Sequence, residues 1–207
     1  MNWTEFKDLA YKMGLSVDEG VHKELCVYHG FLLDWSERVR LISRGDRTRI
    51  WERHFDDSLL GYSHLPDKGS VLDLGSGGGL PGLPLAMLRK DLRFTLLEPA
   101  RMKSLFLKHV VSEVGLDHIQ VVQERAERFG NQDFDVVLAR GVAPLETLWE
   151  LSVSLLAPGA SLVAYKGPDD PPSIHEAGVV ISTTHLVLNP ATNRERALMI
   201  ATRARST

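Results

Sequence analysis

The sequence predicts an α/β protein in which a helical region precedes a mostly parallel sheet that ends in an antiparallel pair of strands. Three observations support this fold class. The first 65 residues carry apolar side chains at helical spacing. From residue 70 to residue 166, strand-like runs alternate with helical ones, which is typical of parallel strands joined by right-handed crossovers. Two β-rich runs, 179–188 and 196–202, then flank the turn-forming residues 189–193 and indicate the antiparallel pair.

The first 65 residues are predicted to form a helical cap. A capping box at 16–19, with the sequence Ser-Val-Asp-Glu, begins a helix whose apolar positions are Val21, Leu25, Tyr28, Leu32 and Trp35. A second helix is expected from about residue 46 to about residue 60. We therefore expect a cap over residues 1–65 and a core domain over residues 66–207, which together form one compact unit.

The core is expected to begin with a strand and to alternate from there. The expected strands cover 70–74, 93–98, 118–122, 134–139 and 160–166, and the expected helices cover 81–89, 101–114 and 144–157. In such a sheet the carboxyl ends of the parallel strands meet at one edge. Open α/β sheets bind their ligands at that edge, so functional residues are sought directly after the strands.

Residues 71–82 are an apolar strand that runs into a glycine-rich loop. Glycines at 75, 77, 78 and 79 allow a sharp turn and a close approach of backbone N–H groups to a ligand, and Pro81 suits the start of a helix. We therefore predict a bound cofactor rather than a plain turn. The loop also satisfies the G-x-G-x-x-G spacing of dinucleotide-binding folds, and Glu98 follows at the end of the second strand, where a carboxylate can accept ribose hydroxyls. The loop alone leaves two cofactor classes open.

Composition limits the remaining possibilities. The chain of 207 residues, 43% of them hydrophobic, is long enough for one α/β domain with a small extension. Cys26 is the single cysteine, which excludes a disulfide framework and a cysteine-based zinc site, and we expect it to be buried. The eight histidines show no ligand-like spacing, so no metal is expected. No run approaches a membrane span and residues 1–5 lack signal-peptide features, so we expect a cytoplasmic protein without a membrane partner.

The net charge of −3 is unevenly distributed. Between Arg38 and His54, six arginines accompany two acidic residues, a local charge of +4. Near the carboxyl terminus, Glu195 accompanies four arginines: Arg194, Arg196, Arg203 and Arg205. Because guanidinium groups bind phosphates through paired hydrogen bonds, both clusters are candidate phosphate-contacting patches. The alternative is that they are solvated faces of helices and strands.

Five segments carry a more specific pattern. They are Arg53-His54-Phe55-Asp56-Asp57-Ser58-Leu59, the glycine loop at 71–82, Arg125-Ala126-Glu127, Ala139-Arg140-Gly141-Val142-Ala143-Pro144-Leu145, and Lys166-Gly167. In this order, and across nearly the whole chain, they resemble the bacterial 16S rRNA guanine-N7 methyltransferases of the small subunit, a family historically called glucose-inhibited division protein B. This spread is far more specific than any glycine loop.

The resemblance implies a class I S-adenosylmethionine-dependent methyltransferase fold, a Rossmann-like sheet whose parallel part ends in an antiparallel strand pair. It implies S-adenosyl-L-methionine as cofactor and 16S ribosomal RNA or the small ribosomal subunit as partner, and we expect a monomer. The implied cofactor contacts are Gly75, Gly77 and Leu80 at the loop, Glu98 at the ribose, Ala126 and Glu127 at the adenine, and Arg140 at the methyl-transfer site. Arg140 can position either the cofactor carboxylate or the target nucleotide there. The implied RNA contacts are His54, Lys166, Arg194 and Arg196.

These residues also have purely structural interpretations. Glu98 can pair with Arg101 at the start of the next helix. Arg140 can be a salt-bridge partner at a strand end, and Lys166 can be a solvated loop residue. For His54, docking of the cap against the core is the favoured interpretation.

The expected chemistry needs no catalytic base. Guanine N7 carries an in-plane lone pair that is not protonated near neutral pH, so it can attack a sulfonium methyl directly. The lack of a recognisable catalytic dyad agrees with this. The alternatives are a dinucleotide-dependent oxidoreductase, a non-catalytic RNA-binding module on the same fold, and a methyltransferase for a small molecule or a protein.

Overall fold

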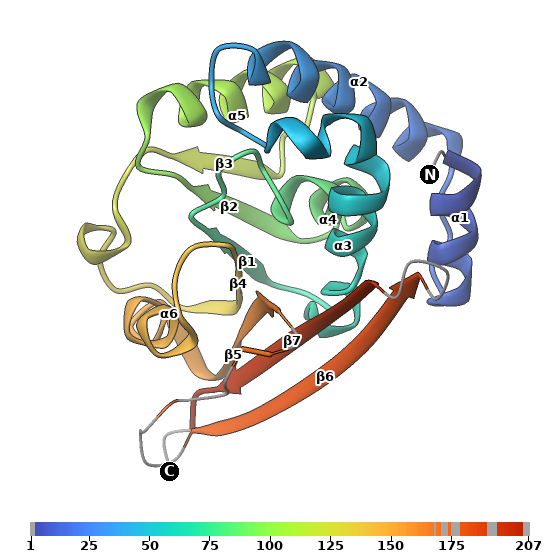
Figure 1. The fold of residues 1–207 in the computed structure, drawn as a ribbon. Coiled ribbons are helices and arrows are strands. Elements are labelled where there is room, and N and C mark those ends of the chain that lie inside the picture. Colours follow the sequence, from blue (N-terminus) through green and yellow to red (C-terminus); the bar gives the residue numbers. More distant parts are fainter. Residues whose placement is uncertain (1–2, 168, 171–173, 175–178, 190–193, 205–207) are drawn as a thin grey trace.

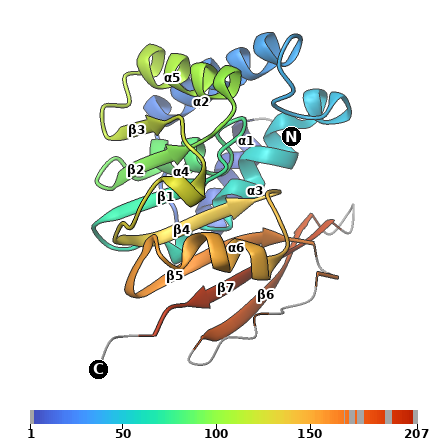
Figure 2. The same cartoon turned by 90° about the vertical axis from the view of Figure 1, so that its left-hand side faces the viewer.

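The computed structural model of the chain describes residues 3–167, 169–170, 174, 179–189 and 194–204. Its centre is a seven-stranded sheet in the order β3-β2-β1-β4-β5-β7-β6, and Figure 2 shows the strands one below the other in that order. The strands are β1 (Ser70–Leu74), β2 (Arg93–Leu97), β3 (Ile119–Val122), β4 (Phe134–Arg140), β5 (Leu156–Lys166), β6 (Val180–Asn189) and β7 (Arg194–Thr202). β1 to β5 pair in parallel, and β7 pairs antiparallel with β5 and β6. The predicted fold class is confirmed.

Helices cover the two faces of the sheet (Figure 1). The helices and helical turns are α1 (Trp3–Lys12), α2 (Glu19–Ser36), η1 (Arg44–Arg49), η2 (Trp51–Phe55), α3 (Asp56–Leu59), η3 (Tyr62–His64), α4 (Gly82–Leu88), α5 (Arg101–Val114), η4 (Ala126–Arg128) and α6 (Leu145–Ser152). Neighbouring strand residues point to opposite faces. Val71 therefore packs into one apolar cluster with the N-terminal helices, α4 and α5, whereas Leu72 packs into a second cluster with α6.

The N-terminal helices share an apolar core with the sheet. Phe6 of α1 and Leu25 of α2 are fully buried in the same cluster as the strand residue Phe94. Trp35 of α2 also contacts Phe106 of α5, with ring centroids 5.6 Å apart. Apolar packing thus crosses the predicted boundary at residue 65, and the division into cap and core stays a prediction. Among the described residues, no helix is both long and apolar enough to cross a bilayer.

Three local predictions need correction. The N-cap of α2 is Asp18, whose carboxylate accepts a hydrogen bond from the Val21 amide, and not Ser16 of the expected capping box. Cys26 is exposed. It follows the buried Leu25 by one residue, and one residue turns a helix by about 100°, so its side chain leaves the apolar stripe. The helix expected near residues 46–60 is a 3₁₀ turn, a π turn and one short α-helix in succession.

The helix expected at 144–157 ends at Ser152, and the strand expected at 160 begins earlier, at Leu156. Leu155 and Leu156 are fully buried, and buried leucines fit a helix and a strand equally well by periodicity alone. Pairing of Leu156 with Phe134 of β4 decides for the strand.

Candidate functional site

The glycine loop lies at the carboxyl end of β1 and is held by the neighbouring strand. The amides of Gly75 and Ser76 donate to the carbonyl of Leu97, at 2.9 and 3.1 Å. Glu98 Oε2 accepts from the Gly77 amide at 2.8 Å, and Glu98 Oε1 accepts from the Ala100 amide at 2.8 Å. This buried carboxylate therefore ties the glycine loop to the segment after β2, instead of making the alternative ion pair with Arg101.

Asp73 lies beneath the loop and is a residue that sequence reasoning missed. Its carboxylate is buried and accepts a hydrogen bond from the Gly82 amide at 3.2 Å. A Cβ atom on Gly82 would lie 2.5 Å from Asp73 Oδ2, so glycine is required at this close approach. An acidic residue inside an otherwise apolar strand, directly before a glycine loop, was the available signal for this role.

Tyr28 of α2 supports the loop from the helical side. Its hydroxyl donates to the carbonyl of Gly78 at 2.5 Å, and its side chain is fully buried. The carbonyl of Leu41 also lies 3.3 Å from the point where a Cβ of Gly78 would stand. The N-terminal helices therefore form part of the wall of the glycine loop. Sequence reasoning had placed Tyr28 in the core only.

We expect Tyr28→Phe to lower the free energy of unfolding by about 1–3 kcal/mol, because the buried Gly78 carbonyl loses its hydrogen-bond donor. The matched control is Tyr11→Phe, since Tyr11 is 81% exposed. Urea unfolding of both variants measures the difference. Equal stabilities of the two variants would show that the Tyr28 hydroxyl does not support the loop.

A second group of polar residues lies at the carboxyl ends of β4 and β5. Arg140 ends β4, and its Nη2 lies 2.6 Å from Nδ1 of His54 in the π turn η2. A guanidinium only donates, so His54 Nδ1 must accept and the proton of this neutral imidazole is on Nε2. Arg140 Nη1 lies 3.7 Å from Asp57 Oδ2, and Arg196 of β7 donates to the same oxygen at 3.1 Å. Isolated π turns frequently mark functional sites.

These residues line a partly open cavity of about 240 Å³, which we call the arginine-140 cavity. Its lining residues are Asp46, Arg53, His54, Asp57, Arg140, Gly141, Tyr165, Lys166, Gly167 and Arg196. An engineered cavity of about 150 Å³ holds benzene, so this one has room for a bicyclic base. Three of the predicted RNA contacts thus meet here with Arg140, whereas Asp46, Asp57 and Tyr165 were missed. The side chain of Arg194 lies outside the described part of the chain.

The glycine loop and the arginine-140 cavity are neighbours. A Cβ on Gly75 would lie 2.8 Å from Cγ2 of Val142, two residues after Arg140. The segment after β4 therefore passes directly over the loop. The loop and the cavity are therefore adjacent at the carboxyl edge of the sheet.

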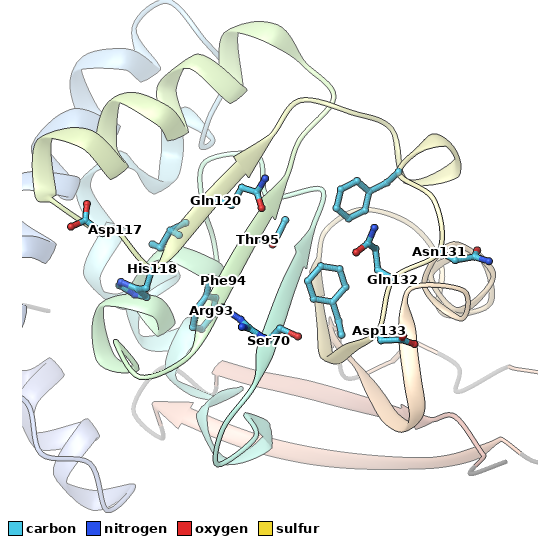
Figure 3. Close-up of a pocket in the computed structure, with 13 residues that line it drawn as sticks. Ser70, Arg93, Phe94, Thr95, Asp117, His118, Gln120, Asn131, Gln132 and Asp133 are labelled. Carbon is cyan, nitrogen blue, oxygen red and sulfur yellow. The ribbon is translucent and has the colours of Figure 1, made fainter. Parts of the chain in front are cut away.

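A larger hollow lies at the opposite edge of the sheet. Figure 3 shows its lining, which includes Ser70, Arg93 and Gln120 near the amino ends of the strands, and its volume is about 640 Å³. It exists because the connection from β3 to β4 contains only the 3₁₀ turn η4 (Ala126–Arg128) and no helix to cover that part of the sheet. Ligands of open α/β sheets bind at the carboxyl ends of the strands, so we place the candidate site there.

Comparison with known proteins identifies the family. Residues 21–197 match the family described as GidB, rRNA small subunit methyltransferase G. The chain belongs to this family.

Individual relatives agree with this assignment. The chain is 41% identical over 148 residues to a ribosomal RNA small subunit methyltransferase G of Moorella thermoacetica, and the match covers 68% of this chain. It is 37% identical over 183 residues to the protein of the same name in Sorangium cellulosum, covering 85% of this chain and 77% of that protein. Matches to the Moorella and Nocardioides proteins span 62% and 56% of those relatives, so the chain covers less than two thirds of their length.

Solved structures share the fold of this chain. Pyrococcus horikoshii TYW2 in complex with MeSAdo has a TM-score of 0.57 at 14% identity, covering 74% of this chain and 63% of that chain. A SAM-dependent methyltransferase from Aquifex aeolicus has a TM-score of 0.54 at 14% identity, covering 74% and 92%. Both likenesses support the predicted class I methyltransferase fold.

The remaining predicted site residues also lie at the carboxyl edge of the sheet. Leu80 is buried in the apolar cluster beneath the glycine loop. Ala126 and Glu127 form the turn η4 after β3, with Ala126 half-buried and Glu127 exposed. Lys166 donates to the carbonyl of Ala143 at 2.6 Å, so it is anchored rather than a solvated loop lysine. The ligand contacts assigned to these residues stay predictions.

The titration of Asp73 gives a pH test for the glycine loop. Burial raises the pKa of Asp73 from 3.8 to about 7, and the nearby charge of Glu98 adds to the rise, although the Gly82 amide and Arg140 oppose it. The folded state therefore holds a proton that the unfolded state releases. This contribution to stability is complete below pH 3.8 and is lost as the pH rises through about 7.

We expect Asp73→Asn to remove this dependence. Between about pH 4 and about pH 7, the free energy of unfolding of the wild type should fall relative to the variant by up to about 1.4 kcal/mol per pH unit. Urea unfolding of both proteins across this range measures it. If the free energies of unfolding of the wild type and the variant change equally with pH, Asp73 is not protonated beneath the loop.

Proposed function

We propose that this chain transfers a methyl group from S-adenosylmethionine to N7 of a guanine in 16S ribosomal RNA. Its family and the printed names of relatives such as the Moorella protein support this proposal. The observation that carries it is the adjacency of a glycine loop, with Glu98 against its backbone, to a polar cavity around Arg140. One chain supplies both halves of this site, so we propose that it acts as a monomer, in the cytoplasm where ribosomal RNA is found.

The residues at the carboxyl edge fit the cofactor. Glu98 brings a buried carboxylate to the loop, and each carboxylate oxygen can accept more than one hydrogen bond, so ribose hydroxyls find an acceptor beside Gly77. A hollow of about 330 Å³ lies between the segments after β2 and β3 and suits the adenine. Its lining residues are Pro99, Ala100, Gln123, Glu124, Arg125 and Arg128. When bound, the cofactor supplies an electrophilic methyl group on a sulfonium sulfur.

The chain contributes by orienting the two reactants. Guanine N7 needs no base, so we assign no residue to proton abstraction. Arg140 Nη1 is buried and has no hydrogen-bond acceptor among the described residues, so it can donate to an oxygen of the nucleotide in the arginine-140 cavity. The hydrogen bond to His54 and the ion pair with Asp57 hold this guanidinium in place. Correct placement of two reactants can supply about 7–11 kcal/mol in favourable cases.

The target guanine is proposed to come from an unpaired RNA segment. A base stacked in a helix cannot enter a cavity of this kind, whereas an unpaired base can be turned out of its stack. The cavity of about 240 Å³ lies at a strand edge among Arg140, Lys166 and Arg196, which suits a nucleotide with a negative phosphate.

Calorimetric titration tests the cofactor. We expect saturable binding of S-adenosylhomocysteine and no binding of NAD⁺ or NADH. Glu98→Gln should weaken the binding of S-adenosylhomocysteine by about 10-fold or more, because a hydrogen bond to a charged group contributes about 1.5–3 kcal/mol. Glu113→Gln, at an exposed position of α5, is the control with the same change of charge. Binding of NAD⁺ in place of the thioether would favour the oxidoreductase alternative and overturn the proposal.

A further inference from the structure

The structure separates the six arginines between Arg38 and Arg53 into two groups. Three are paired within the segment and its neighbours: Arg47 with Glu37, Arg49 with Glu52, and Arg53 with Asp46. The other three, Arg38, Arg40 and Arg44, are exposed and form no ion pair with any residue that the structure describes. The positive charge of this cluster is therefore concentrated on three guanidinium groups.

These three arginines line one hollow of about 680 Å³, which we call the arginine hollow. Val39 and Ile42 contribute its apolar part, and none of its lining residues is aromatic. Binding of unpaired bases relies on aromatic side chains as stacking platforms. The arginine hollow is thus suited to the charged backbone of a nucleic acid rather than to its bases.

The arginine hollow lies beside the methyl-transfer site. Leu41, in the middle of the loop that carries the arginines, approaches Gly78 so closely that its carbonyl would stand 3.3 Å from a Cβ there. Two residues after Arg44, Asp46 lines the arginine-140 cavity. Figure 1 shows this loop running down from the end of α2 to η1. The same short segment therefore borders the glycine loop, the cavity and the hollow.

We propose that the arginine hollow binds backbone phosphates of the RNA strand that flanks the target guanine. This inference rests on the proposed function for the identity of the nucleic acid. Each exposed guanidinium can hold a phosphate through two hydrogen bonds. Phosphate contacts fix the register of a strand without reading its sequence, so the hollow positions the strand while the arginine-140 cavity holds the base.

The test measures RNA binding as a function of salt. The variant is the triple substitution Arg38→Gln, Arg40→Gln and Arg44→Gln. The control, Lys7→Gln, Lys68→Gln and Arg93→Gln, removes the same total charge at exposed positions elsewhere, and Figure 3 shows Arg93 at the amino-terminal edge of the sheet. The probe is transcribed 16S rRNA, bound without cofactor at constant magnesium from about 50 to about 200 mM salt, the range in which phosphate contacts dominate.

We expect the slope of log affinity against log salt to become shallower by about 2 in the triple variant, because each phosphate contact on a single strand contributes about 0.7. At about 150 mM salt, affinity should fall about tenfold or more, and the control should match the wild type. Binding of S-adenosylhomocysteine should be unchanged in both. An unchanged slope, or an equal loss in the control, would overturn the inference.

Methyl transfer by the wild type distinguishes this failure from failure of the proposed function. In one outcome the wild type methylates 16S rRNA, and the triple variant has the same slope of log affinity against log salt as the wild type. The arginine hollow is then not a phosphate site, and the proposed function stands. If the wild type transfers no methyl group to RNA in any assembled or free form, the proposed function is wrong. The inference, which depends on that function, then falls with it.

Discussion

Replacing Arg140 by alanine is expected to lower kcat for methyl transfer by about 10²–10³-fold, the usual effect of removing one preorganised donor from an active site. The guanidinium lies at the end of β4, between His54 and Asp57, and one of its nitrogens has no acceptor among the described residues. A group held this firmly from two sides can orient a nucleotide without rearranging. Transfer of tritium from labelled S-adenosylmethionine to 16S rRNA measures the change.

Two controls keep this result interpretable. Arg93→Ala removes the same side chain at an exposed position on the other edge of the sheet, and it should leave kcat unchanged. Binding of S-adenosylhomocysteine to Arg140→Ala should stay within about threefold of the wild type, a difference of less than about 1 kcal/mol. Near-normal turnover in Arg140→Ala would show that Arg140 is only a packed strand-end residue. If Arg140→Ala instead loses its binding of S-adenosylhomocysteine, Arg140 contacts the cofactor rather than the nucleotide.

The largest expected effect on stability comes from Gly82→Ala. The added methyl would stand 2.5 Å from Asp73 Oδ2 and 2.7 Å from Cδ2 of Leu96, and all three residues are buried. Overpacking of this kind costs about 1–3 kcal/mol, and the Asp73 carboxylate cannot move without losing its bond to the Gly82 amide. We therefore expect the free energy of unfolding to fall by an amount at or above the top of that range.

Gly30→Ala is the matched control for this substitution. Gly30 lies inside α2, and apart from its chain neighbours and the backbone of its own helix, no atom lies within 4 Å of the point where its Cβ would stand. Alanine is the better helix former by about 1 kcal/mol, so this variant should be more stable than the wild type. Urea unfolding of both variants measures the two changes in the free energy of unfolding. Equal shifts for Gly82→Ala and Gly30→Ala would contradict the close packing of Asp73 against the loop.

The sequence was sufficient for features that depend on local pattern. The strand at 70–74, the helix at 101–114 and the antiparallel pair are found where periodicity predicted them. Parallel strands buried on both faces are continuous apolar runs, and glycines mark the turns, so these signals are strong. The prediction was wrong at Leu155 and Leu156, because a short apolar run fits a helix and a strand equally well.

The contacts that build the candidate site were beyond local pattern. Tyr28 and Gly78 are 50 residues apart, and His54 and Arg140 are 86 residues apart. Such pairs are set by how the N-terminal helices lie on the sheet, which no spacing along the chain encodes. For the same reason six arginines in one stretch looked alike in sequence, although only the folded chain shows which of them Glu37, Asp46 and Glu52 neutralise.

The most direct test of the central claim is to map N7-methylguanosine in 16S rRNA from cells with and without this protein. Cells that lack it should lose one such mark, and purified wild-type protein with S-adenosylmethionine should restore it in small subunits from those cells, whereas Arg140→Ala should not. An unchanged set of N7-methylguanosines in the absence of the protein would contradict the account.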